Sequence, residues 1–117
     1  DILTGGSGAD IFQFTTAANA LINKDIITDF SAPLDTIQLE NAIFRAFGAL
    51  PTGTTLAASA FWASANGQAH DADDRILYNT TTGQIIYDSN GNGAGGFVQV
   101  AVLQNKAVIT NADFVII

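Results

Sequence analysis

The sequence predicts an all-β fold in which the last turns of a parallel β-roll pack on a β-rich, sandwich-like cap with one short helix. Three observations lead to this fold class. A glycine-rich nonapeptide stands near the N-terminus, short β-type runs alternate with turns from Arg75 onward, and Gly, Asn and Asp mark those turns. The 117 residues fit one domain, within which we assign residues 1–40 to the roll and residues 41–117 to the cap.

The nonapeptide Gly5–Gln13 matches the repeat G-G-x-G-x-D-x-U-x of calcium-binding parallel β-helices at every position, and Asp1–Thr4 fits the end of a preceding repeat. Its glycines allow a tight turn that points carbonyl oxygens inward. Asp10 adds a carboxylate, and we expect Phe12 to pack inward on the next strand. Calcium takes about six to eight oxygen ligands, so the rest of a site must come from a neighbouring coil. The alternative is a glycine-rich loop that simply precedes a strand.

The middle of the chain predicts short elements. Residues 25–39 read as two short strands around a turn at Ser31–Leu34. The alanine-rich stretch that follows has helical spacing over residues 55–63, where we expect the one short helix.

The segment after Arg75 reads as β-structure. We expect a hairpin of residues 75–79 and 84–88 closed by Gly83, because glycine suits the left-handed position of such a turn. The remaining predicted elements are a Gly/Asn-rich loop at 88–96, a strand at 97–103, a turn at 105–106, closing strands at 107–109 and 114–117, and a capped turn at 110–113.

Three further groups of polar residues are candidate cation ligands. Asp88–Gly93 has oxygen-bearing side chains at loop positions 1, 3 and 5 and glycine at 6, like the opening of an EF-hand loop, but Gln99 replaces the bidentate Glu. The run Asp71–Asp74 places three carboxylates together, and it precedes the hairpin that ends at Asp88. Asp25, Asp29 and Asp35 border the predicted strands near the roll. The alternatives are an Asn/Gly turn, a solvated acidic turn and carboxylates that cap turns. The candidate metal ligands are Asp1, Gly6, Gly8, Asp10, Asp29, Asp35, Asp73, Asp74, Asp88, Asn90 and Asn92.

Composition excludes several functions. A formal net charge of −7 leaves no basic footprint for nucleic acid and predicts repulsion from anionic membranes. The chain has no cysteine, hence no disulfide or thiolate site, and no apolar run near the ~20 residues of a membrane helix. It shows no signal peptide, and because it contains no methionine we expect a piece of a longer or processed protein.

No catalytic motif is present. His70 is the only histidine, and we expect it to be exposed rather than catalytic. No sequence context supports a Ser–His–Asp triad, a zinc motif or a phosphate-binding loop. We therefore expect no enzymatic activity, and we expect Trp62 and the phenylalanines to belong to the core.

With these motifs established, the chain resembles the C-terminal region of RTX (hemolysin-type calcium-binding) proteins over nearly its whole length. The resemblance rests on the motifs Gly5–Gln13, Asp25–Phe30, Asp35–Leu39, Asp71–Asn79, Tyr87–Gly95 and Asp113–Ile117. It implies a calcium-binding parallel β-roll with Ca²⁺ between its turns, ended by a β-rich cap. It also implies a secreted, extracellular or cell-surface protein of a Gram-negative bacterium, exported by the type I secretion machinery with an uncleaved signal at Ala112–Ile117.

The expected function is therefore that of a calcium-binding RTX domain that folds on extracellular calcium. The expected partners are calcium ions, the type I machinery during export and upstream repeats of the parent chain, with no nucleic acid and no membrane insertion. Two alternatives remain at this stage. One is a calcium-dependent glycan-binding module of a polysaccharide-modifying enzyme, which predicts a groove lined by exposed aromatic or basic residues. The other is the structural cap of a surface adhesin.

Overall fold

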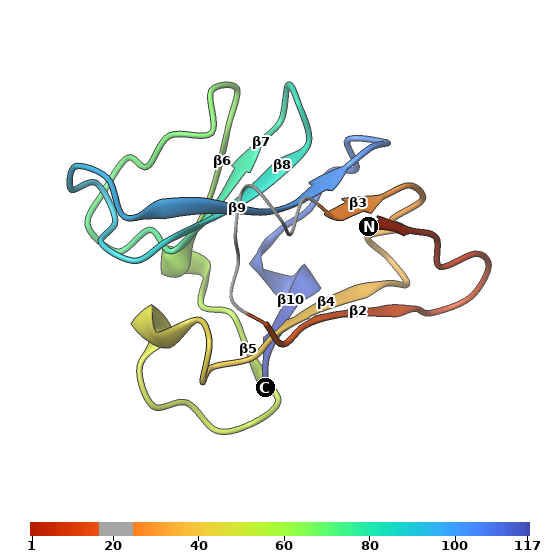
Figure 1. Ribbon diagram of the computed structural model, residues 1–117, viewed down its shortest axis with the longest axis horizontal. Coiled ribbons are helices and arrows are strands. Elements are labelled where there is room, and N and C mark those ends of the chain that lie inside the picture. Colours follow the sequence, from red (N-terminus) through yellow and green to blue (C-terminus); the bar gives the residue numbers. More distant parts are fainter. Residues whose placement is uncertain (17–24) are drawn as a thin grey trace.

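The computed structural model describes residues 1–16 and 25–117, and its strands form two mixed sheets (Figure 1). Sheet A has the order β1-β3-β9-β8-β7-β6, and sheet B has the order β2-β4-β10-β5. The strands are β1 (Ile2–Leu3), β2 (Ile11–Phe14), β3 (Asp25–Ile27), β4 (Thr36–Leu39), β5 (Thr54–Thr55), β6 (Phe61–Ser64), β7 (Ile76–Asn79), β8 (Gln84–Asp88), β9 (Phe97–Leu103) and β10 (Phe114–Ile116). Three 3₁₀ turns complete the described part: η1 (Arg45–Phe47), η2 (Ala58–Ala60) and η3 (Asn111–Asp113).

Three passes of the chain run from sheet A to sheet B in the same direction. They are β1 to β2, β3 to β4, and β9 to β10, and in each sheet the second pass lies between the first and the third (Figure 1). All four pairings between successive passes are parallel, with Ile26 opposite both Ile2 and Val102, and Ile37 opposite both Phe12 and Phe114. The third pass thus comes from the C-terminal end of the sequence.

Strand pairing crosses the boundary that we predicted between residues 40 and 41. Strands β9 and β10 lie in the predicted cap, yet they pair directly with β3 and β4 of the predicted roll. The reason is that β3 and β4 each need a hydrogen-bonding partner on the side away from β1 and β2, and the C-terminal strands provide it. The predicted β-rich class agrees with the structure.

The hairpin and the turns form where the sequence placed them. Strands β7 and β8 pair antiparallel, and Gly83 has a φ of 81°. The turn at 31–34 joins β3 to β4, with the amide of Asp35 donating to the carbonyl of Ser31. Thr110 and Asp113 form a capping box around η3, as expected for a capped turn.

Two predicted elements are wrong. Residues 55–63 contain the end of β5, the single 3₁₀ turn η2 and the start of β6 instead of a helix. An isolated helix of this length nucleates poorly, whereas sheet pairing here satisfies the backbone: Leu56 donates to Phe114, and Ala60 accepts from Arg75. Residues 107–109 form no strand: they pair with no strand of the described part, and the Ala107 carbonyl accepts a hydrogen bond from the Tyr78 hydroxyl.

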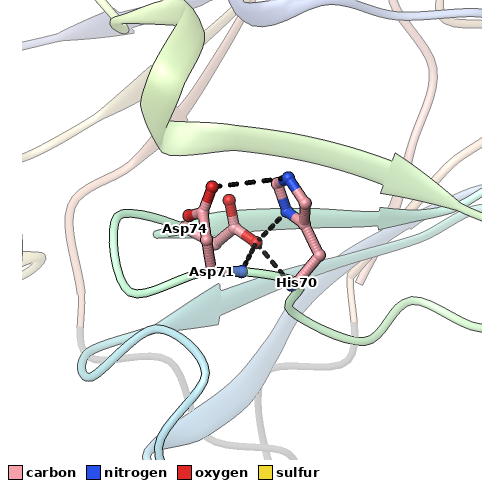
Figure 2. Close-up of side chains that lie close together, drawn as sticks. All are labelled: His70, Asp71 and Asp74. Carbon is pink, nitrogen blue, oxygen red and sulfur yellow. Dashed lines mark hydrogen bonds and ion pairs between the residues drawn. The ribbon is translucent and has the colours of Figure 1, made fainter.

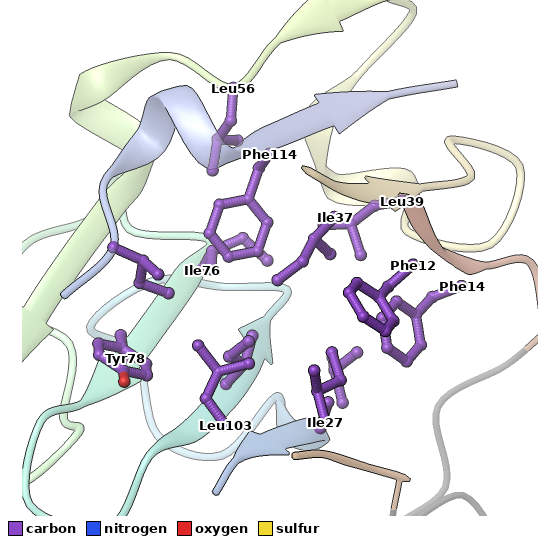
Figure 3. Close-up of a cluster of buried hydrophobic side chains, with 14 of the residues drawn as sticks. Phe12, Phe14, Ile27, Ile37, Leu39, Leu56, Ile76, Tyr78, Leu103 and Phe114 are labelled. Carbon is purple, nitrogen blue, oxygen red and sulfur yellow. The ribbon is translucent and has the colours of Figure 1, made fainter. Parts of the chain in front are cut away.

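The core fills the space between the two sheets (Figure 3). Phe12, Phe14, Leu39 and Phe114 enter it from sheet B, as predicted for Phe12, and their counterparts come from β3, β7, β8 and β9. Side chains alternate between the two faces of a strand, so residues two apart on each strand point into the same core. Residues from all three passes therefore belong to one core.

Gly83→Ala is expected to destabilise the protein by more than about 2 kcal/mol, because the positive φ is strained for alanine and the new Cβ would collide with the carbonyl oxygen of Leu103. Gly48→Ala is the matched control. Gly48 also has a positive φ, 79°, but open space around its Cβ position, so about 1 kcal/mol is expected. Urea unfolding curves measure both. Equal losses in the two variants would contradict the steric account.

Candidate functional site

The glycine turn between β1 and β2 is tied to the next pass by Asp29. One oxygen of Asp29 accepts a hydrogen bond from the Gly5 amide at 3.0 Å, and the other accepts from the Gly6 amide at 2.8 Å. These two hydrogen bonds outweigh partial desolvation and lower the pKa of Asp29 below its ordinary value. Asp29 therefore acts here as a bridge between two successive turns.

Asp35 makes a second bridge between the same turns. Its Oδ1 accepts from the Asp10 amide at 2.9 Å, and its Oδ2 accepts from the Ser31 amide at 2.8 Å. Asp35 is buried, so both carboxylate oxygens are satisfied by backbone donors instead of by water. The structure thus joins Asp10, Asp29 and Asp35 at one end of the parallel passes, whereas the sequence grouped Asp29 and Asp35 with Asp25.

Asp10 itself remains only partly satisfied. Its carboxylate folds over Gly5, where any Cβ would collide with it, so the glycine makes room for the acid. Within the described residues, its Oδ2 is buried and accepts no hydrogen bond. A buried carboxylate oxygen without a donor is costly, and a cation removes that cost.

The acidic run forms a compact cluster with His70 (Figure 2). Asp74 is fully buried, and its Oδ2 accepts from the His70 amide at 2.7 Å, lies 2.7 Å from His70 Nδ1 and accepts from the Asp71 amide at 3.2 Å. His70 Nε2 lies 3.3 Å from a carboxylate oxygen of Asp71, and the imidazole stacks on Trp62 with ring centroids 3.6 Å apart. Both ring nitrogens of His70 therefore face carboxylates.

Burial opposes ionisation of Asp74, but hydrogen bonds from the amide and ring of His70 and the amide of Asp71 lower its pKa below the ordinary value. Asp74 is therefore a carboxylate at neutral pH. Its second oxygen, Oδ1, is buried and accepts no hydrogen bond from the described residues. Asp74 Oδ1 is therefore a second buried carboxylate oxygen without a hydrogen-bond donor, like Asp10 Oδ2.

His70, Asp71 and Asp74 are a group of potential metal ligands in the described part of the chain, with ligand atoms within 4.8 Å of one another. The sequence placed Asp74 among the candidate ligands but left His70 and Asp71 out. His70 was predicted to be exposed, and its side chain is about half exposed at 45%. The i, i+4 spacing of His70 and Asp74 was the available signal. The side chain of Asp73 is not part of this group; together with Arg75 it lines a cavity elsewhere on the surface.

The Asn/Gly loop contacts the acidic run through backbone atoms. Gly91 has a φ of 66°, and the carbonyl of Ala72 fills the space of its missing Cβ, so the two loops lie against each other as the sequence suggested. Asp88 is buried, and its Oδ1 accepts from the Asn90 amide at 3.1 Å. The side chain of Asn90 donates to the Ala94 carbonyl and closes the loop, while Asn92 lines a cavity.

The remaining candidates lie near the first turn. Gly6 and Gly8 have positive φ values of 88° and 97°, and the amide of Gly6 faces Asp29. The carbonyl of Asp1 accepts from Ile26 at 2.7 Å as part of the sheet. The structure therefore gathers the predicted ligands at separate places: the turns of the parallel passes, the acidic run, and the Asn/Gly loop.

Acid is expected to destabilise the metal-free protein through Asp29. Its folded pKa lies below the ordinary 3.8, so its stabilising effect is full above that value and is lost as pH falls through the folded pKa. Melting temperatures between about pH 6 and pH 2.5 measure this effect. Asp29→Asn is expected to give a shallower decline over that range.

Asp113 works in the opposite direction, because burial outweighs the Thr110 hydrogen bond and raises its pKa. Asp113 contributes equally to wild type and to Asp29→Asn, so the difference between their melting-temperature profiles does not contain its effect. Parallel pH profiles for wild type and Asp29→Asn would contradict the bridging role of Asp29.

A comparison of the chain with protein-family models, with curated proteins and with solved structures finds no match. None of the helices in the described ranges has the length and apolar character that a membrane crossing requires.

Proposed function

We propose that this chain is a calcium-binding C-terminal domain of the RTX type, from a secreted bacterial protein, and that it folds on extracellular calcium. The observation that carries the proposal is the pair of orphaned carboxylate oxygens. In the described residues, Asp10 Oδ2 and Asp74 Oδ1 are buried without a hydrogen bond, and both acids belong to sequence motifs of the RTX resemblance.

The two places fit a hard divalent cation. Calcium prefers carboxylate and carbonyl oxygens, and each site offers an ionisable acid beside a backbone turn. At the first place Asp10 would hold the ion next to the glycine turn, and at the second place Asp74 would hold it with Asp71. Bound calcium would supply positive charge to oxygens that now lack a donor, and would thereby stabilise the folded chain.

The parallel passes support the roll that the family implies. Successive passes stack in register, and Asp29 and Asp35 bridge their turns. At the other side of each sheet, β1 and β2 are edge strands that expose Ile2 and Ile11 at 74% and 60%. Upstream repeats of the parent chain are the proposed partners for these edges.

Burial of the C-terminal strand supports the proposal that the chain folds only after export. Phe114 and Ile116 are fully buried in the folded core. If residues 112–117 are the type I secretion signal, the export machinery can bind them only while the chain is unfolded. Calcium sites of extracellular modules have dissociation constants of roughly 10⁻⁴ to 10⁻³ M, so they would stay empty inside the cell and fill outside. We propose no catalytic role.

The test is thermal unfolding of metal-free protein with and without about 5 mM CaCl₂, with MgCl₂ at the same concentration as control. At ten times its dissociation constant, calcium adds about 1.4 kcal/mol per site, so two sites should raise the melting temperature by roughly 10 °C. An unchanged melting temperature in calcium, or an equal rise in magnesium, would refute the proposal.

A further inference from the structure

The outer face of sheet A holds a cavity of about 400 Å³. Its floor consists of Leu77 and Ile86, which are cross-strand neighbours on β7 and β8. The residues that flank them along the strands, such as Ile76 and Ile85, belong to the core, so alternation places Leu77 and Ile86 on the opposite face. A cavity of this size lies in the range of small-molecule sites, about 300–1,000 Å³.

Two loops build the walls of the cavity. Residues 66–69 form one wall, and residues 91–93 form the other. Asn66 is held in place, because its Oδ1 accepts hydrogen bonds from Ser64 Oγ and from the Gln68 amide. Its amide nitrogen is left to donate to a ligand. A polar group fixed before binding costs little to order when a ligand arrives.

The charge of the lining restricts the ligand. Asp88 lines the cavity, only 3% of it is exposed, and its Oδ1 accepts a hydrogen bond from the Asn90 amide. Among the residues that the structure describes, the lining contains no lysine or arginine. An anionic ligand would therefore meet an uncompensated carboxylate, whereas a hydroxyl group would donate to it.

Phe97 adds an aromatic surface at the same cavity. It is 66% exposed, so the prediction that every phenylalanine belongs to the core is wrong for this residue, and its ring lines the cavity. An aromatic ring packs against the apolar C–H face of a sugar, while surrounding amides and carboxylates bind its hydroxyls. Buried acid, fixed amide and exposed aromatic ring together suit a ligand with one apolar face and several hydroxyls.

The geometry points to a binding site for a neutral saccharide in this cavity. Sugar hydroxyls donate to Asp88 Oδ2 and accept from Asn66, and the ring lies against Phe97. The site involves neither Asp10 nor Asp74, so it stands apart from the calcium proposal.

The test begins with an array of neutral oligosaccharides and uronic acid oligomers, probed with wild-type protein in calcium. At least one neutral oligosaccharide is expected to bind, and the uronates are not. A ¹H–¹⁵N titration with that oligosaccharide is expected to shift the amides of Gly67, Gly91 and Gly93. Phe97→Ala is expected to weaken binding by about tenfold or more. Ile11→Ala, which removes another exposed apolar side chain on β2, is expected to bind as wild type.

The inference is overturned if no neutral oligosaccharide binds at up to about 10 mM, which corresponds to a very weak site. It is also overturned if the shifts map elsewhere, if uronates bind better, or if Phe97→Ala and Ile11→Ala behave alike. The melting temperature of each variant in calcium is recorded in parallel. Loss of calcium stabilisation alone bears on the proposed function, and loss of saccharide binding alone bears on this site.

Discussion

Replacing Asp74 by asparagine is expected to lower the free energy of unfolding in calcium by about 3 kcal/mol and to remove one site's share of the calcium-dependent stabilisation. The carboxylate is fully buried and gathers three hydrogen bonds through one oxygen. The amide cannot carry the charge that these donors and the ion favour, and it buries an NH₂ group where Oδ1 now lies without a donor. Urea unfolding with and without calcium measures both effects.

Asp73→Asn is the matched control, because it makes the same chemical change one residue away on an exposed side chain. It is expected to change stability by less than about 0.5 kcal/mol and to keep the full calcium response. If Asp74→Asn kept that response while Asp73→Asn lost it, the assignment of Asp74 as the ligand would be wrong.

Phe114→Ala is expected to cost about 3–5 kcal/mol, because the side chain is fully buried between the sheets and its ring lies 5.7 Å from that of Phe61. Domains of this size are stable by only about 5–15 kcal/mol. The third parallel pass is therefore expected to hold the whole domain together, and the variant is expected to be largely unfolded in warm, metal-free buffer. Circular dichroism melts follow the loss.

Phe97→Ala is the matched control for size and chemistry. Phe97 lies on β9 with 66% of its surface exposed, so its removal is expected to change stability by less than about 0.5 kcal/mol. Similar losses in the two variants would show that β10 contributes no more to the core than an exposed ring does.

The sequence predicted the local elements well where side-chain chemistry determines them. Gly83 marked the hairpin turn, and Thr110 with Asp113 marked the capped turn. The pairing of β3 with β9 and of β4 with β10 could not be predicted from the sequence, because long-range parallel pairing leaves no local pattern. The expected helix at 55–63 failed for a related reason: helical spacing over a few alanines is weaker than a strand partner supplied by distant residues.

Of the acids at the candidate site, the sequence pointed to Asp10 and Asp74 but not to Asp71, and it did not reveal their partners. The glycine repeat pointed to Asp10, and the acidic run pointed to Asp74. The bridges from Asp29 to Gly5 and Gly6 depend on how two turns stack, and the stacking of Trp62 on His70 depends on the pairing of β6 with β7. Such contacts depend on tertiary structure, so no residue spacing in the sequence predicts them.

Terbium luminescence tests the central claim most directly, because Trp62 is the only tryptophan in the chain and stacks on the histidine that contacts Asp74. Terbium is a hard cation that takes the same oxygen ligands as calcium. Excitation of Trp62 in metal-free protein titrated with TbCl₃ is expected to give sensitised emission that calcium displaces, that Asp10→Asn retains and that Asp74→Asn loses. Absence of sensitised emission, or equal emission from the Asp74→Asn variant, would contradict a cation site at this carboxylate.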